Sequence, residues 1–245
     1  MRMTLMTALA TGTIAAAVPD RTPSLVTVAP RSQARGVALI AHGGKSKSTA
    51  PDSNLRTPAL RMFPFMADLA RAGRRGGLAV AQLRYRMVGY NDGDPVQDVE
   101  WALDELWSRF GVPVCLVGHS MGARAALRAA GHGSVTAVAG LAAWCPPREP
   151  VAQLGGRTVM LVHGERDRIA DPAGSLDLGR RARSSAARIA RFEIARAGHT
   201  MLERLPLWQS LTRRFVLGAL GLEPMDERIA AAFALPPERA LRVPL

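Results

Sequence analysis

The sequence predicts an α/β fold, in which a mostly parallel sheet is covered by helices on both faces. From Arg35 onward, apolar runs of strand length alternate with amphipathic stretches of helical length. Strands that are apolar along their whole length are typical of parallel sheets buried between helices. The length of 245 residues and the 48% hydrophobic content suit one domain with a sizeable core. We therefore expect a single domain over residues 1–245.

Each element is placed by its apolar pattern and by the residues that flank it. Pro64 lies inside the first helical stretch and suggests that this helix begins there. Asp94 and Pro95 suit the N-cap and the first position of the second helix. The expected strands cover residues 36–41, 78–83, 112–117, 135–144, 158–162 and 189–194, and the expected helices cover 57–74, 94–109, the residues after 122, 171–187 and 202–217.

The two ends of the chain are less regular. Residues 1–35 are expected to supply edge strands, because Leu25 to Val28 forms a strand-like run. Residues 1–20 also contain a mildly apolar stretch with Ala-x-Ala sites, which is a weak secretory signal interrupted by threonines. We expect a cytoplasmic protein, with secretion as the alternative. Residues 221–245 form a tail with a short helical segment and no role that the sequence assigns.

The composition limits the partners that the protein can have. The net charge is +12, and its cations are arginines apart from Lys45 and Lys47. The arginines are spread along the chain without interleaved aromatics, so we expect no nucleic-acid partner, and the charge serves either a solvated surface or an anionic substrate. No apolar run is long enough to span a membrane. Cys115 and Cys145 lie in apolar runs and are expected to be buried, with no metal site. The oligomeric state stays open.

The stretch 112–124, VPVCLVGHSMGAR, organises the chain. An apolar strand meets Gly-His-Ser-Met-Gly, and a helical pattern follows at once. This is the G-x-S-x-G pattern of a nucleophile elbow in its strand–turn–helix context. The tight turn lifts the hydroxyl of Ser120 clear of the backbone and makes Ser120 the candidate nucleophile. It also leaves the Met121 N–H at a helix N-terminus, where it can stabilise an oxyanion.

Two further loops complete a candidate catalytic triad. Asp167, in the stretch HGERD after a buried strand, is the candidate acid, with Glu165 and Asp171 as rivals. His199, in the stretch AGH after the last predicted strand, is the candidate base. The chain order is then Ser, Asp, His, which is the order of triads built on a nucleophile elbow.

A third stretch, HGGK at 42–45, follows the strand that begins at Gly36. Glycines there let backbone N–H groups approach a reacting oxygen. The N–H of Gly44 is the second candidate donor of an oxyanion hole, and the N–H of Lys45 is its rival.

These four stretches together resemble the α/β-hydrolase family, over roughly residues 36–217. Within that family the chain is similar to small carboxylesterases and dienelactone-hydrolase-like serine hydrolases. The resemblance implies an eight-stranded, mostly parallel sheet and the hydrolysis of esters or thioesters through an acyl-enzyme. A serine nucleophile does not fit the branches that use aspartate, namely haloalkane dehalogenases and epoxide hydrolases.

Many relatives carry a helical lid between the sixth and seventh strands, and this chain departs from them. Residues 145–157 are too few for a lid, and three prolines there resist a long helix. At most one short helical turn, near residues 151–154, is expected. The substrate pocket must then be walled by other residues. We expect Trp144 to line the acyl pocket, and the loop 84–94 to form the opposite rim through Tyr85 and Tyr90. Arg84 and Arg86 in that loop are either solvated or placed to favour an acidic substrate.

The sequence thus predicts a serine ester hydrolase that acts on a small-molecule substrate and needs no cofactor. Two alternatives remain at this point. An acyltransferase or perhydrolase would use the same triad with another acceptor, and a non-catalytic binding module would keep the scaffold alone.

Overall fold

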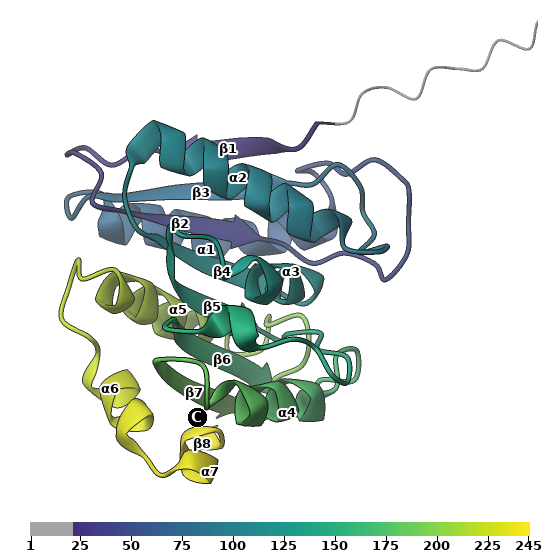
Figure 1. Ribbon diagram of the computed structural model, residues 1–245, viewed down its shortest axis with the longest axis vertical. Coiled ribbons are helices and arrows are strands. Elements are labelled where there is room, and N and C mark those ends of the chain that lie inside the picture. Colours follow the sequence, from purple (N-terminus) through teal and green to yellow (C-terminus); the bar gives the residue numbers. More distant parts are fainter. Residues whose placement is uncertain (1–21) are drawn as a thin grey trace, which may run out of the picture.

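The computed structural model describes residues 22–245, and its centre is one eight-stranded sheet between two layers of helices (Figure 1). The strand order is β1-β3-β2-β4-β5-β6-β7-β8. Neighbouring strands are parallel except for β1, which pairs antiparallel with β3. The sequence prediction of a mostly parallel sheet is confirmed. The strands are β1 Ser24–Val28, β2 Gly36–Ala41, β3 Leu78–Arg84, β4 Val114–His119, β5 Val135–Leu141, β6 Thr158–Gly164, β7 Arg188–Ile194 and β8 Val243–Pro244.

Helices cover both faces of the sheet, and each face has its own apolar core. In Figure 1, α2, α3 and α4 lie in front of the sheet, while α1 and α5 lie behind it. Leu103 of α2 and Leu178 of α4 belong to the first core, and Phe65 of α1 and Trp208 of α5 belong to the second. The helices are α1 Thr57–Gly73, α2 Asp94–Phe110, α3 Met121–Ala129, α4 Pro172–Ala182, α5 Leu205–Ala219, α6 Glu227–Ala234 and α7 Pro237–Ala240.

The central strands are buried along their whole length. Every residue of β2, β4 and β6 is buried, because helices pack on both of their faces. Parallel strands all end at the same edge of the sheet, so the loops after β2, β4, β6 and β7 gather there. This edge is where ligands bind in open α/β sheets.

The first helix differs from the prediction, because α1 begins at Thr57 and Pro64 lies inside it. Pro58 occupies the first turn, where a missing N–H costs nothing. Pro64 deprives the carbonyl of Leu60 of its helical donor. Leu60 and Phe63 beside it are exposed, so the proline lies next to the solvent-facing side of the helix. The second helix begins at Asp94, one residue earlier than an N-cap role for Asp94 implies.

The C-terminal tail supplies the eighth strand, which the sequence does not reveal. After α6 and α7, the two residues of β8 pair with β7 at the edge of the sheet. Ile229 is buried in the second core and Leu241 in the first. The tail therefore closes this edge on both faces. At the other edge, β1 is the one N-terminal strand among the described residues, and the signal-like stretch at 1–20 lies outside them.

The connection between β5 and β6 contains no lid. Its one helical element is a single 3₁₀ turn, Ala152–Leu154, at the place where the sequence predicts at most a short turn. Within residues 22–245, no helix combines the length and apolarity that crossing a membrane requires.

Candidate active site

The strand-to-helix turn at Ser120 is strained and tightly packed. β4 ends at His119, α3 begins at Met121, and Ser120 between them has φ 55° and ψ −119°. A positive φ is costly for a residue with a side chain and persists only when the surroundings enforce it. A Cβ at position 118 would lie 2.4 Å from the Cα of Ala123, and one at position 122 would lie 2.2 Å from the carbonyl oxygen of Ala41. The two glycines therefore allow the close approach that holds the serine at the helix N-terminus.

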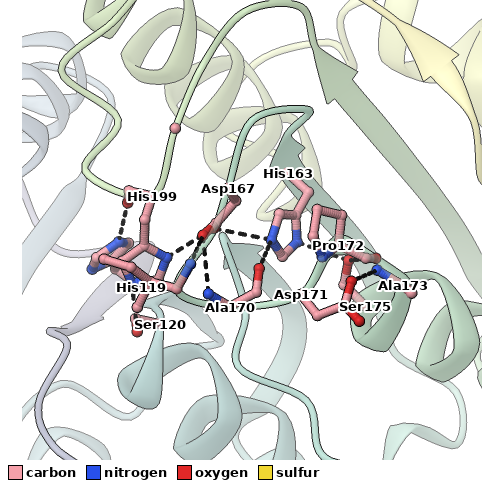
Figure 2. A network of polar contacts seen from close by, with 12 residues as sticks. His119, Ser120, His163, Asp167, Ala170, Asp171, Pro172, Ala173, Ser175 and His199 are labelled. Atoms are coloured by element: carbon pink, nitrogen blue, oxygen red, sulfur yellow. Dashed lines mark hydrogen bonds and ion pairs between the residues drawn. The ribbon is translucent and has the colours of Figure 1, made fainter.

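Ser120, His199 and Asp167 form one hydrogen-bonded line (Figure 2). The Nε2 of His199 lies 2.9 Å from the Oγ of Ser120, and its Nδ1 lies 2.8 Å from the Oδ2 of Asp167. All three side chains belong to buried residues. The rival acids lie elsewhere: Asp171 caps α4 by accepting from the N–H of Ala173, and Glu165 is exposed. The structure brings together the three residues that the sequence selects.

The carboxylate of Asp167 is surrounded by donors. Its Oδ1 accepts hydrogen bonds from the backbone N–H groups of Ile169 and Ala170, both at 2.9 Å. Its Oδ2 faces His199 and also His163, whose Nε2 is 3.1 Å away. Burial by itself raises the pKa of Asp167, but the hydrogen bonds from His163, His199 and the two amides outweigh it and hold that pKa well below its usual range. The carboxylate is therefore ionised and fixed in orientation.

His163 is a second histidine on the same carboxylate, and the sequence alone gives it no functional role. Its Nε2 faces two acceptors, the Oδ2 of Asp167 and the carbonyl oxygen of Ala170 at 3.0 Å. A proton on Nε2 satisfies both. Its Nδ1 lies 2.8 Å from the Oγ of Ser175, which accepts a hydrogen bond from the Nε of the buried Arg191. The signal in the sequence is the spacing in HGERD, which places His163 four residues before Asp167.

His119 fixes the backbone of the loop that carries His199. Its Nε2 donates to the carbonyl oxygen of His199 at 2.9 Å, and its Nδ1 is buried without a partner among the described residues. Burial, more than any neighbouring charge, lowers the pKa of His119 to about 3. The ring is therefore neutral at physiological pH and acts as a hydrogen-bond donor.

The buried His119 predicts a specific pH dependence of stability. An exposed histidine in the unfolded chain has a pKa near 6.5, so between pH 6.5 and about 3 the unfolded chain binds a proton that the folded chain does not. The free energy of unfolding should thus fall on acidification, by up to about 1.4 kcal/mol per pH unit from this residue. His119→Gln keeps a donor but does not titrate. The free energy of unfolding, measured in urea at several values from pH 7 to pH 4, should fall less steeply with decreasing pH in this variant than in the wild type. An identical dependence on pH in the two proteins would contradict the account.

Two backbone N–H groups beside Ser120 are candidate donors of an oxyanion hole. A Cβ at position 44 would lie 2.6 Å from the Sδ of Met121, so the loop after β2 packs directly on the start of α3. Neither the N–H of Gly44 nor that of Met121 donates a hydrogen bond to another described residue. The N–H of Lys45, in contrast, donates to the carbonyl oxygen of Val88 at 3.0 Å. Gly44 is therefore better placed as a donor than its rival.

A pocket of about 250 Å³ opens at the Ser120 hydroxyl. Trp144 lines it, as the sequence predicts, and its backbone N–H donates to the carbonyl oxygen of Ser120 at 3.3 Å. Ile169 stands on the wall formed by the acid loop and is 73% exposed, which leaves the entrance apolar and open. The residues that line the pocket are Gly44, Lys45, Ser46, Ser120, Met121, Trp144, Ile169 and Ala170.

The loop 84–94 does not line the Ser120 pocket, and the prediction for Tyr85 is wrong. Tyr85 is fully buried, and its hydroxyl donates to the carbonyl oxygen of His42 at 3.1 Å. Its side chain lies on the same face as those of Ala81 and Leu83 of β3, so it packs in the first core. Arg84 and Arg86 also turn away, Arg84 to the Oγ of Ser24 and Arg86 to the carboxylate of Asp98. They are therefore structural.

Tyr90 does not line the Ser120 pocket, but it packs against Trp144, which does. It is 4% exposed and packs edge-on against Trp144, with ring centroids 5.6 Å apart. Its ring lines an adjacent hollow and is absent from the wall of the Ser120 pocket. The prediction that Tyr90 forms the rim of the acyl pocket is corrected accordingly.

No family model matches the chain, and no curated protein matches it in sequence. Its similarities are to solved structures. A homologue of α/β serine hydrolases from Coxiella burnetii has 17% identity and a TM-score of 0.59, over 78% of this chain and 90% of that one. A lidless α/β serine hydrolase from Xanthomonas campestris has 18% identity and a TM-score of 0.58, over 81% and 88%. The chain has the α/β-hydrolase fold. Est1E from Butyrivibrio proteoclasticus, solved with ferulic acid bound, adds 13% identity and a TM-score of 0.60, over 81% and 96%.

The part of the chain that the structure describes contains no cluster of side chains suited to a metal ion. Residues 22–245 contain no group of three or more His, Cys, Asp or Glu side chains arranged to hold a metal ion. Cys115 and Cys145 are buried free thiols, as expected. Burial raises the pKa of both, so neither is a reactive thiolate.

Proposed function

We propose that the protein is a serine hydrolase that cleaves carboxylic esters or thioesters of small acyl groups through an acyl-enzyme on Ser120. The observation that carries the proposal is the line from the Ser120 hydroxyl through His199 to Asp167, with contacts of 2.9 Å and 2.8 Å. It joins a nucleophile, a base and a residue that orients the base. A non-catalytic scaffold has no need of this alignment or of the strained backbone at Ser120.

The reaction begins when His199 accepts the proton of Ser120 and the serine oxygen attacks the acyl carbon. The N–H groups of Gly44 and Met121 stabilise the oxyanion that forms. Collapse of this intermediate breaks the bond to the alcohol or thiol, which leaves with the proton from His199. Water, activated by the same ring, then attacks the acyl-enzyme and restores Ser120. Asp167 holds the His199 tautomer and stabilises its imidazolium form.

The size of the site favours small substrates. The pocket of about 250 Å³ is smaller than typical ligand sites in proteins. Trp144 closes one side and the connection between β5 and β6 adds no cover. Est1E, with its bound ferulic acid, and the lidless hydrolase from Xanthomonas campestris support the same class of activity.

Labelling with a fluorophosphonate tests the proposed nucleophile. The probe should modify the native protein at Ser120, because only an activated serine attacks its phosphorus at a useful rate. A Ser120→Ala variant and heat-denatured protein serve as controls and should stay unlabelled. Hydrolysis of a panel of acyl esters graded by chain length should then show highest activity for short chains. An unlabelled native protein, or labelling that survives in Ser120→Ala, would overturn the proposal.

The missing lid predicts simple kinetics at an oil–water interface. Lipases gain activity there by moving a lid, and no such element covers Ser120 in residues 22–245. The rate should therefore saturate with dissolved tributyrin and should not jump when the ester exceeds its solubility. The measurement is the initial rate across that limit. A sharp rise at the limit would show that some segment covers the site in solution.

A further inference from the structure

A second hollow lies beside the Ser120 pocket, with a volume of about 400 Å³. The two cavities share Ser46 and Trp144 in their walls, so they adjoin. Arg124 lines the second hollow and comes one helical turn after Ser120, a rise of about 6 Å along α3. Lys47, Tyr90, Asp92 and Arg128 also line the hollow.

Arg124 is held rigidly in the wall of this hollow. Its Nε donates to the Oε2 of the buried Glu149 at 2.8 Å. Its guanidinium carbon lies 3.9 Å from the ring centroid of Tyr90 and 4.7 Å from that of Trp144. Such stacking on aromatic faces fixes the plane of an arginine. The two terminal nitrogens make no hydrogen bond with another described residue, so they remain available as a two-pronged donor.

The charge around the hollow is positive. Arg128 shares Glu149 with Arg124, so two cations are balanced by one buried carboxylate. Lys47 adds a third cation, and Asp92 is the one carboxylate in the wall itself. The chain has only two lysines, and each lines one of the two adjoining cavities. Arginines spread over the surface for solubility would not explain why both lysines lie at these two cavities.

From these observations we infer that the second hollow binds a carboxylate carried by the substrate. The inference rests on the proposed function, because it assigns part of the substrate to a cavity next to Ser120. A planar carboxylate matches the two free nitrogens of a fixed guanidinium, and Lys47 supplies a further point charge. The substrate class is then an ester that carries a second, ionised carboxyl group a few atoms from the scissile bond.

Matched esters test the inference. Monoethyl glutarate carries a carboxylate on the acyl side, and diethyl glutarate is its neutral counterpart. 4-Acetoxybenzoate carries the carboxylate on the leaving group, and its methyl ester is the neutral counterpart. In at least one pair, the anionic ester should have a kcat/KM about tenfold above that of the neutral ester, mainly through a lower KM. This is the order expected for one charge-assisted hydrogen bond in a partly open site.

Variants distinguish a contribution of the hollow's side chains from an effect of the protein's overall positive charge. Lys47→Gln and the double variant Arg124→Gln with Glu149→Gln should each reduce the preference to below about threefold, since each removes a donor. Glu149 is replaced together with Arg124 because a buried carboxylate that has lost this partner would be destabilising. Arg71→Gln removes an equally charged side chain that is 79% exposed on α1, and it should leave the preference unchanged. Ratios between variants cancel the intrinsic reactivities of the esters.

The outcomes distinguish this inference from the proposed function. If Ser120 is labelled and both members of each pair react with equal kcat/KM, the protein is an esterase and the carboxylate site is wrong. If no ester reacts, calorimetry with glutarate tests the hollow alone. Binding that weakens about tenfold in Lys47→Gln, as expected for one lost charged contact, would support the site, and no binding to the wild-type protein would overturn it.

Discussion

Replacing Ser120 by alanine should lower kcat for an activated ester by about 10⁶-fold, the order found when the nucleophile of a serine triad is removed. Alanine keeps the Cβ and meets the same strain at φ 55°, so the fold should persist. Only the attacking oxygen is lost. The measurements are turnover of 4-nitrophenyl acetate and thermal unfolding.

Ser134→Ala is the matched control for this variant. Ser134 is also buried, and its hydroxyl contacts His132 rather than His199. Its replacement should leave kcat unchanged. If Ser120→Ala kept most of the wild-type turnover with an intact fold, another group would be the nucleophile.

Replacing Asp167 by asparagine should lower kcat by about 10⁴-fold, the order seen when the tautomer of a triad histidine is lost. The amide keeps the size of the carboxylate but offers a donor where the Nδ1–H of His199 needs an acceptor. It also faces the Nε2 of His163, 3.1 Å from Oδ2, so neither ring keeps its hydrogen bond to this position. The measurement is kcat for the same ester, with circular dichroism to establish the fold.

Asp171→Asn supplies the control for Asp167. Asp171 accepts from the N–H of Ala173 at the start of α4, and asparagine caps helices about as well. Activity and stability should both stay near wild type. A large loss in Asp171→Asn with little loss in Asp167→Asn would reassign the acid.

The sequence predicts the geometry of the proposed catalytic triad because each part is set locally. The pattern around Ser120 forces one turn, since only glycine tolerates the contacts at positions 118 and 122. Asp167 and His199 follow buried strands, and parallel strands deliver their ends to the same edge of the sheet. A local pattern and one topological rule together bring the three side chains to one point.

Other features depend on packing between distant segments, which no local pattern records. Tyr85 directly follows a strand, and its hydroxyl donates to the carbonyl oxygen of His42, a residue that directly follows another strand. The strand β8 has two residues and exists because the tail folds back on β7. The roles of His163 and His119 likewise depend on partners that their own sequence neighbours do not identify, except for the spacing from His163 to Asp167.

The acyl-enzyme itself is the central claim, and trapping it is the most direct test. Wild-type protein mixed with 4-nitrophenyl acetate and quenched rapidly in acid should carry one acetyl group. Trypsin releases Ser120 in the peptide 110–124, apart from Lys45 and Lys47. Mass spectrometry should place the acetyl group on Ser120 in that peptide, with a burst of nitrophenol equal to the protein present. Ester turnover without acetylation of Ser120, or acetylation confined to the two lysines, would contradict the account.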